Sequence, residues 1–479
     1  MTRRHPWNGC SNTFPPPFLQ WLWLCCTITS LVLKAAAAAA AAAEPSLTTT
    51  MTTTPSQRLA FVNYHRHRTT RSGGVDCPTK SLRGPLSTSI TDTNNVDAVP
   101  TVNNELLSRL EGLKLPPLPD PAADPADDVF RSMRDTWPLE RINFLRDSGL
   151  GRLIADTLFV LGLPVFAREY PDAIETFFSL TTRCRTERYG LHSSQFLDFI
   201  EPDAPNGPLQ SSSSSSSSPE TTANQDDKDD VQKGNNDIVV VCHGGAWGSG
   251  QPWMYRIMAD CFVQRNHTVA VWGYRTYPDG NVADQSQDLI DAIAFIRQKY
   301  PGRTITVIGH SSGGHVGMLA AIQVAQSQNT TQPLCERFIS LGAVYDVPNH
   351  VQWERARGLD ELSPLNPAAG GTNDAWIAAS PTRIVEQHTV MNGGALTPMP
   401  PSMLLVHGGR DTVVPYTSSL NLTKALYSNN PTYRGCRFEL LPTTGHADTV
   451  IDIMFGGPTQ EAVLRWMDGD TERTPYELD

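Results

Sequence analysis

A serine between two glycines, in the sequence G-H-S-S-G at residues 309–313, is the strongest chemical signal in the chain. An apolar run at 304–308 precedes it and a helical pattern follows it, so Ser311 is predicted to lie on a tight turn between a strand and a helix. Glycines two residues before and after the serine avoid clashes with that strand and helix. Such a turn lifts the Ser311 hydroxyl into a cleft as a nucleophile. A glycine-rich turn of a Rossmann-like protein is the alternative for this motif alone.

Two consecutive glycines, Gly244 and Gly245, lie in the sequence H-G-G-A-W at residues 243–247, directly after the apolar run 238–242. Glycines in this position let backbone N–H groups approach a substrate oxygen closely. Together with the N–H of Ser312, the residue after the candidate nucleophile, they are predicted to form an oxyanion hole. A phosphate-binding loop is the alternative, and it fits poorly because the G-x-G-x-x-G pattern and the P-loop lysine are both missing.

Asp411 and His446 follow two further predicted strands, in the sequences H-G-G-R-D-T-V-V-P at 407–415 and G-H-A-D at 445–448. A carboxylate on the first of these loops can hold an imidazole from the second in one tautomer and stabilise its charged form. The chain order Ser311, Asp411, His446 is the order found in α/β-hydrolases. Taken singly, the aspartate and the histidine are more simply a turn residue and a surface residue. Their combination with the other two motifs predicts a catalytic triad.

The elements that must position these residues alternate between strands and helices over the second half of the chain. Strands are predicted at 196–200, 238–242, 268–273, 304–309, 337–341, 403–407 and 437–441, and amphipathic helices between them include 285–298 and 312–326. This alternation predicts an α/β fold, that of an α/β-hydrolase, with a mostly parallel central sheet and helices on both faces. Sites in such sheets lie at the carboxyl ends of the strands, where every motif above falls.

Composition and charge exclude several other classes of protein. The chain has 479 residues and a net charge of −11, which disfavours nucleic-acid binding. Its nine cysteines include no C-x-x-C pair and cannot form a fully paired disulfide framework. His310 and His315 have no acidic partner at metal spacing, so packing is favoured over metal ligation. Neither a metal nor a cofactor is expected.

The chain is predicted to divide into four parts. An apolar run at 18–33, preceded by Arg3 and Arg4 and followed by an alanine tract, predicts a cleaved signal peptide or a retained signal anchor over residues 1–43. We expect a disordered tail at 44–125, a helical region at 126–194 and a catalytic domain at 195–479 that carries a disordered serine-rich insert at 203–236. The chain is expected in the secretory pathway or endomembranes, with a plastid as the alternative, and its N-terminal segment is the expected route of membrane association.

The region from residue 195 to residue 468 resembles carboxylesterases of the α/β-hydrolase family, particularly the group with an H-G-G-x-W motif that contains isoprenylcysteine methylesterases and kynurenine formamidases. The matching pieces are residues 195–198, 243–247, 273–275, 278, 309–315, 380–381, 407–415 and 445–446. The G-Y-R piece at 273–275 and the preceding helical region are most similar to the isoprenylcysteine methylesterase branch, which implies a membrane-associated N-terminus. The chain departs from that branch in its serine-rich insert and in lacking a clean spanning stretch.

The motifs and the resemblance give three functional hypotheses. The first is a serine hydrolase of small carboxylic esters, with a prenylcysteine methyl ester as the substrate that the resemblance implies. The second is an aryl formamide hydrolase like the kynurenine formamidases, which uses the same triad. The third is a hydrolase fold that binds a ligand without catalysis, which the complete triad disfavours. Trp247, Trp253 and Tyr274 are predicted to line the pocket, with core packing as the alternative. Asp346 is predicted to cap a helix, with a position facing the cleft as the alternative.

Overall fold

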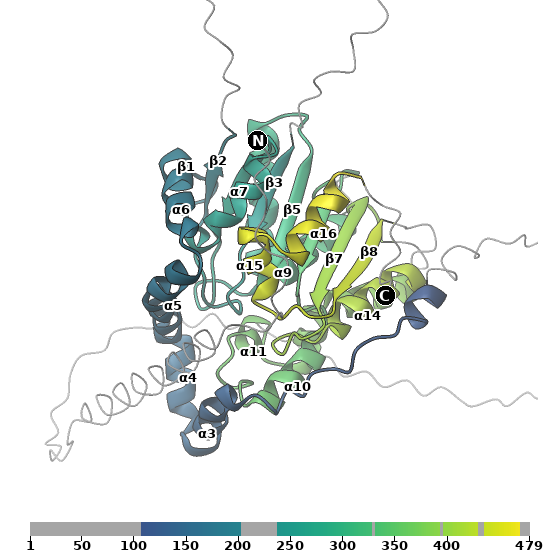
Figure 1. The fold of residues 1–479 in the computed structure, drawn as a ribbon. Coiled ribbons are helices and arrows are strands. Elements are labelled where there is room, and N and C mark those ends of the chain that lie inside the picture. Colours follow the sequence, from purple (N-terminus) through teal and green to yellow (C-terminus); the bar gives the residue numbers. More distant parts are fainter. Residues whose placement is uncertain (1–106, 203–236, 328–330, 393–395, 430–434, 470–479) are drawn as a thin grey trace, which may run out of the picture. The chain divides into compact units, whose positions relative to one another are not determined.

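Figure 1 shows the computed structural model, which describes residues 107–202, 237–327, 331–392, 396–429 and 435–469. The predicted signal segment, the tail as far as residue 106 and the serine-rich insert at 203–236 lie outside the described residues. The centre of the described part is an eight-stranded sheet with the order β1-β2-β4-β3-β5-β6-β7-β8. Its strands are β1 (Cys184–Arg188), β2 (Phe196–Ile200), β3 (Ile238–Cys242), β4 (Thr268–Trp272), β5 (Ile305–His310), β6 (Arg337–Leu341), β7 (Ser402–Gly408) and β8 (Cys436–Leu441).

The sheet is parallel from β4 to β8, whereas β1 and β2 form an antiparallel edge. Its central strand β3 reads I-V-V-V-C, and all five of its residues are buried. Branched apolar side chains on both faces are typical of a parallel strand that helices cover on both sides. The prediction of a mostly parallel sheet in an α/β-hydrolase fold is confirmed.

One strand was not predicted from the sequence. Strand β1 reads C-R-T-E-R and pairs with β2, so that Cys184 lies opposite Ile200 and Arg188 opposite Phe196. As an edge strand it exposes Arg185 and keeps charged residues on its surface, so it shows no apolar pattern. The sheet therefore begins ahead of residue 195, where the sequence had placed the start of the catalytic domain.

Helices cover both faces of the sheet (Figure 1). One apolar cluster joins the sheet to α8, α9 and α14, and a second joins it to α7, α15 and α16. Asp346 caps α10 as predicted, because its Oδ1 accepts a hydrogen bond of 3.2 Å from the backbone N–H of Asn349. The helices are η1 (Pro125–Asp127), α3 (Asp128–Thr136), α4 (Leu139–Asp147), α5 (Leu150–Glu169), α6 (Asp172–Arg183), η2 (Pro252–Met258), α7 (Ala259–Val263), α8 (Val282–Lys299), α9 (Ser312–Gln326), α10 (Val347–Arg357), α11 (Leu365–Ala368), α12 (Asn373–Ala378), α13 (Pro381–Asn392), α14 (Thr417–Asn429), α15 (Asp448–Phe455) and α16 (Pro458–Met467).

Residues 107–125, the last part of the predicted disordered tail, pack against the hydrolase core. Residues 107–111 are helical, and Leu110 among them is 4% exposed and belongs to the larger apolar cluster. The Tyr416 hydroxyl donates a hydrogen bond of 2.6 Å to the carbonyl oxygen of Pro116. The prediction of disorder is wrong for this stretch, because its leucines find a buried surface that its own sequence does not reveal.

Candidate active site

Ser311 lies on the turn between β5 and α9, where its backbone has φ 53° and ψ −122°. This conformation is strained for a residue other than glycine. A Cβ on Gly309 would lie 2.7 Å from the backbone of the following helix, and a Cβ on Gly313 would lie 2.5 Å from the carbonyl oxygen of Cys242 at the end of β3. The two glycines therefore let the turn form and let it pack directly against the start of the H-G-G-A-W loop.

The three side chains predicted as a triad lie together at the carboxyl ends of β5, β7 and β8. His446 Nε2 lies 3.0 Å from Ser311 Oγ, and His446 Nδ1 lies 2.7 Å from Asp411 Oδ2. Both are hydrogen-bond distances, so the imidazole can take the serine proton while the carboxylate holds its opposite nitrogen. Asp411 is 1% exposed, and its charge is therefore shielded from solvent.

The Asp411 carboxylate is held by backbone amides and by a second histidine. Its Oδ1 accepts hydrogen bonds from the N–H groups of Val413 at 2.9 Å and Val414 at 2.8 Å. Its Oδ2 faces His446 and lies 3.5 Å from His407 Nε2. Burial alone would raise the pKa of Asp411, but the charge of His446 and the hydrogen bonds from both imidazoles outweigh burial and hold this pKa well below its ordinary value. Asp411 is therefore ionised at neutral pH.

Gly342, which the sequence reasoning missed, makes room for the carboxylate and imidazole. It lies directly after β6, its φ is 57°, and a Cβ on it would lie 3.1 Å from Asp411 Oδ2 and 3.3 Å from His446 Nδ1. A single glycine after a strand is a weak signal. Gly342 directly follows β6, which lies between β5 and β7, the strands that precede Ser311 and Asp411. This position was the one feature that could have identified it.

Replacing Gly342 with Ala is expected to lower kcat on an ester substrate by about 10- to 100-fold, since displacing catalytic groups by 1 Å costs on the order of 10² in rate. Gly302 provides a matched control, because it has a φ of 79° and a Cβ on it would meet nothing within 4 Å. Gly302→Ala carries a similar conformational cost and leaves the site untouched. Steady-state kinetics of both variants would test this role, and equal losses of kcat would contradict it.

The predicted oxyanion-hole residues lie beside the nucleophile turn. Gly245 has φ 140°, and a Cβ there would collide with the carbonyl oxygen of Ser249 at 2.1 Å. Within the described part of the chain, the backbone N–H groups of Gly245 and Ser312 donate no hydrogen bond to a protein acceptor, whereas the Gly244 N–H faces the Tyr255 hydroxyl. Uncommitted N–H groups beside a nucleophile are what an oxyanion hole requires. Their assignment to that role stays a prediction.

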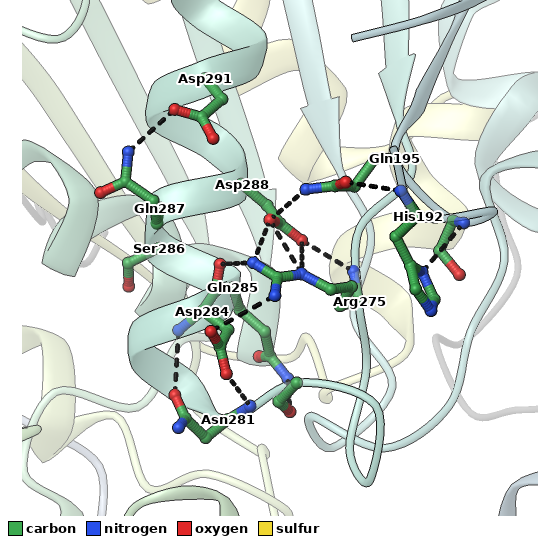
Figure 2. A network of polar contacts seen from close by, with 12 residues as sticks. His192, Gln195, Arg275, Asn281, Asp284, Gln285, Ser286, Gln287, Asp288 and Asp291 are labelled. Carbon is green, nitrogen blue, oxygen red and sulfur yellow. Dashed lines mark hydrogen bonds and ion pairs between the residues drawn. The ribbon is translucent and has the colours of Figure 1, made fainter. Parts of the chain in front are cut away.

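A buried polar network fixes the loops around the site (Figure 2). The side chain of Asp288 on α8 is fully buried and accepts hydrogen bonds from Arg275 Nη2 at 2.6 Å and Gln195 Nε2 at 2.7 Å. Almost one turn earlier on the same helix, Gln285 Nε2 donates to the carbonyl oxygen of Trp247 at 3.0 Å. Helix α8 thereby holds both the loop that follows β4 and the loop that carries Gly244 and Gly245.

Trp247 and Tyr274, predicted to line the pocket, are each 2% exposed and belong to the larger apolar cluster. Trp247 Nε1 donates a hydrogen bond of 2.8 Å to His315 Nδ1, and the Tyr274 hydroxyl donates one of 3.0 Å to the carbonyl oxygen of His243. Because their polar atoms are engaged in these bonds, the structure favours core packing, the alternative interpretation, for both side chains.

Three buried histidines, two of them next to Ser311 or Gly244 in the sequence and the third on α9, are neutral at physiological pH. Burial lowers the pKa of His243 and of His315 to about 4. Burial, together with the charge of His446, lowers the pKa of His310 to about 3. Among the described residues, no group of His, Cys, Asp or Glu side chains is arranged to hold a metal ion.

At any pH between 6 and 5, unfolding of one chain is expected to bind about three protons. The reason is that histidines of an unfolded chain have a pKa near 6.5, whereas these three stay neutral in the folded chain. The unfolded chain binds more protons in this window, so the free energy of unfolding falls as the pH falls. The expected slope is roughly 4 kcal/mol per pH unit. Urea unfolding at several pH values measures it, and a slope below about 1.4 kcal/mol per unit, or one proton, would contradict the expectation.

Comparisons with known proteins find relatives that are named as esterases. A family model described as BD-FAE matches residues 228–426. The probable isoprenylcysteine alpha-carbonyl methylesterase ICMEL2 of Arabidopsis thaliana is 25% identical over 62% of this chain and 67% of its own length. Esterase LipC of Mycobacterium tuberculosis is 25% identical over 48% of this chain and 57% of its own length. The chain has an α/β-hydrolase fold and is similar in sequence to proteins named as esterases.

The matches cover unequal shares of this chain and of its relatives. Isoprenylcysteine alpha-carbonyl methylesterase ICME of Arabidopsis thaliana is 26% identical, and the chain spans half the length of that relative. Among solved structures, esterase B of Lactobacillus rhamnosis is similar with a TM-score of 0.44 and 17% identity, over 65% of this chain and 94% of that one.

Proposed function

We propose that this hydrolase cleaves small carboxylic esters through an acyl-enzyme formed on Ser311. The hydrogen-bonded series from Ser311 through His446 to the buried Asp411 carboxylate carries the proposal. A serine is nucleophilic at neutral pH only when a base takes its proton, and His446 is in position to do so. Relatives named as esterases support the same class of reaction.

In the proposed mechanism, His446 takes the proton of Ser311 as the serine oxygen attacks the ester carbonyl. The N–H groups of Gly244, Gly245 and Ser312 stabilise the resulting oxyanion, each contributing roughly 3 kcal/mol. Protonated His446 then donates its proton to the departing alcohol. Water repeats the same steps on the acyl-enzyme and releases the acid.

The proposed substrate is a prenylcysteine methyl ester. Several relatives are named isoprenylcysteine methylesterases, and such an ester has a long apolar tail. Helix α5 offers apolar side chains to solvent, with Leu153 62% and Phe159 41% exposed. The same helix reaches the loop behind the oxyanion-hole glycines, where Asp156 Oδ1 accepts a hydrogen bond of 3.4 Å from the Gly250 N–H. An apolar surface beside that loop suits an ester with an apolar tail.

Turnover of four compounds tests this function. We expect the chain to hydrolyse p-nitrophenyl acetate. We also expect a higher kcat/KM for farnesylcysteine methyl ester than for cysteine methyl ester. N-formylkynurenine should be hydrolysed more slowly than p-nitrophenyl acetate and more slowly than farnesylcysteine methyl ester. A preference for N-formylkynurenine would contradict ester hydrolysis and favour a formamidase. Absence of turnover on all four, together with no covalent labelling of the serine, would favour a binding protein without catalysis.

We also propose that the N-terminal part of the chain associates with membranes and directs it to the secretory pathway. Helix α5 is long and apolar enough to cross a membrane and is largely exposed. Asp156 and Pro164 within it suit contact with the bilayer interface better than a spanning segment. Flotation of the full chain with phosphatidylcholine vesicles would support membrane association, and a chain that stays unbound would contradict it. A fluorescent fusion confined to the cytosol would contradict entry into the secretory pathway.

A further inference from the structure

The 3-10 helix η2 packs against α5 and α6 and is hydrogen-bonded to β2. Trp253 lies edge-on against Phe159 of α5, with ring centroids 5.6 Å apart, and against Phe177 of α6 at 6.4 Å. The guanidinium of Arg256 donates hydrogen bonds to Asp198 of β2 at 2.7 Å and to a threonine hydroxyl of α6 at 2.8 Å. These contacts leave η2 little freedom to move relative to α5, α6 and β2.

Between these two anchors, Tyr255 points toward the catalytic residues. Its hydroxyl lies 2.8 Å from Nδ1 of His310, the residue before the nucleophile. The His310 ring in turn packs against the ring of His446, with centroids 4.8 Å apart. A Cβ on Gly244 would lie 2.8 Å from His310 Nδ1 and 3.0 Å from the Tyr255 hydroxyl oxygen. The tyrosine and histidine therefore touch both the general base and one oxyanion-hole glycine.

His310 is in no position to exchange protons during turnover. It is 8% exposed, and burial lowers its pKa to about 3, so it is neutral throughout the working range of pH. Its Nδ1 is engaged with the Tyr255 hydroxyl, which fixes the rotation of the ring. A neutral ring with a fixed orientation provides a rigid surface for His446 while adding no charge beside it.

We propose that Tyr255 and His310 are positioning residues for ester hydrolysis, holding the His446 imidazole and Gly244 in place, and that helices α5 and α6 act on the site through Trp253 and η2. The inference rests on the proposed function. It extends the machinery of hydrolysis beyond the triad to a pair of side chains that act through their contacts with His446 and Gly244.

Tyr255→Phe removes one hydroxyl and keeps the ring. On p-nitrophenyl acetate we expect kcat to fall roughly 10-fold with KM within about twofold, since loosened catalytic groups slow the chemical step more than binding. The rate of serine labelling by a fluorophosphonate should fall in parallel. Tyr189→Phe is the matched control, because the Tyr189 hydroxyl also makes buried hydrogen bonds, to the Gly273 carbonyl oxygen at 2.7 Å and from Trp272 Nε1 at 2.9 Å. This control should lose stability without the loss of kcat.

Substitutions of His310 separate positioning from simple packing. The amide of His310→Gln can still pair with the Tyr255 hydroxyl, whereas His310→Leu cannot, so the glutamine variant should keep a kcat several times higher than the leucine variant. In a Tyr255→Phe background that difference should disappear. Trp253→Leu, which removes the ring contacts with α5 and α6, should lower kcat without raising KM.

Several outcomes would overturn this inference. A Tyr255→Phe variant with a kcat equal to that of Tyr189→Phe would refute it while the wild type remained an active esterase. The inference would also be refuted if the kcat of the double variant fell by the product of the two single-variant losses, because the two side chains would then act independently. A wild-type chain that neither hydrolyses the ester nor reacts with the fluorophosphonate would refute the proposed function itself, and the inference would fall with it.

Discussion

An Asp411→Asn variant is expected to hydrolyse esters about 10⁴-fold more slowly than the wild type while remaining folded. Oδ1 of Asp411 accepts two backbone N–H groups, from Val413 and Val414, so the amide oxygen of the asparagine must occupy that position. Its NH2 group then replaces Oδ2 and donates to His446 Nδ1. An imidazole that accepts at Nδ1 carries its proton on Nε2 and cannot take the proton of Ser311.

Asp346→Asn is the matched control for this substitution. Asp346 is also buried and accepts a backbone N–H, but it caps α10 and its carboxylate is bound by Asn349 and Arg383. Asparagine caps helices as well as aspartate does, so kcat should stay within about twofold of the wild type. Stopped-flow or steady-state kinetics with p-nitrophenyl acetate would measure both variants. A kcat for Asp411→Asn within tenfold of the wild type would show that the carboxylate does not set the tautomer of His446.

Ser311→Ala is expected to lower kcat on the order of 10⁵-fold, because no other group replaces the nucleophile. The residual rate would come from binding and from the oxyanion hole alone. Kinetics of the purified variant, with intact mass to exclude wild-type contamination, would measure this loss. An alanine variant that retains one hundredth of the wild-type activity would show that the reaction proceeds without this hydroxyl.

The backbone conformation at residue 311 is expected to lower the free energy of unfolding of the chain. Ser311 has φ 53°, a conformation that glycine adopts without strain. Ser311→Gly should therefore be inactive and yet more stable than Ser311→Ala, by about 1 kcal/mol in the free energy of unfolding. Urea unfolding of the two variants compares them directly, and an equal or lower stability of the glycine variant would argue against strain at this residue.

The buried strands and the glycine-containing turns after them were predictable from the sequence, because each depends on the types of neighbouring residues. Strand β3 is apolar at every position and is followed by two glycines, so both the strand and the loop after it were predicted at the residues where they lie. The same holds for the serine turn after β5. Such patterns are readable because burial on two faces and a tight turn each restrict the residue types at neighbouring positions.

Features that depend on contacts between distant segments were not predictable. Strand β1 is polar because it lies at the edge of the sheet, and Leu110 looks like part of a tail until the surface that buries it is known. Gly342 and Tyr255 belong to no motif. Their importance arises from side chains dozens of residues away, which the fold brings to 2.8 Å from the Tyr255 hydroxyl and to 3.1 Å from a Cβ placed on Gly342.

Covalent labelling is the most direct test of a serine nucleophile activated by His446. The wild-type chain incubated with a fluorophosphonate should gain the mass of one adduct, and peptide mapping should place that adduct on Ser311. The Ser311→Ala chain should gain none, and His446→Ala should react far more slowly. A wild-type chain that stays unmodified, or that carries the adduct on another residue, would contradict the account.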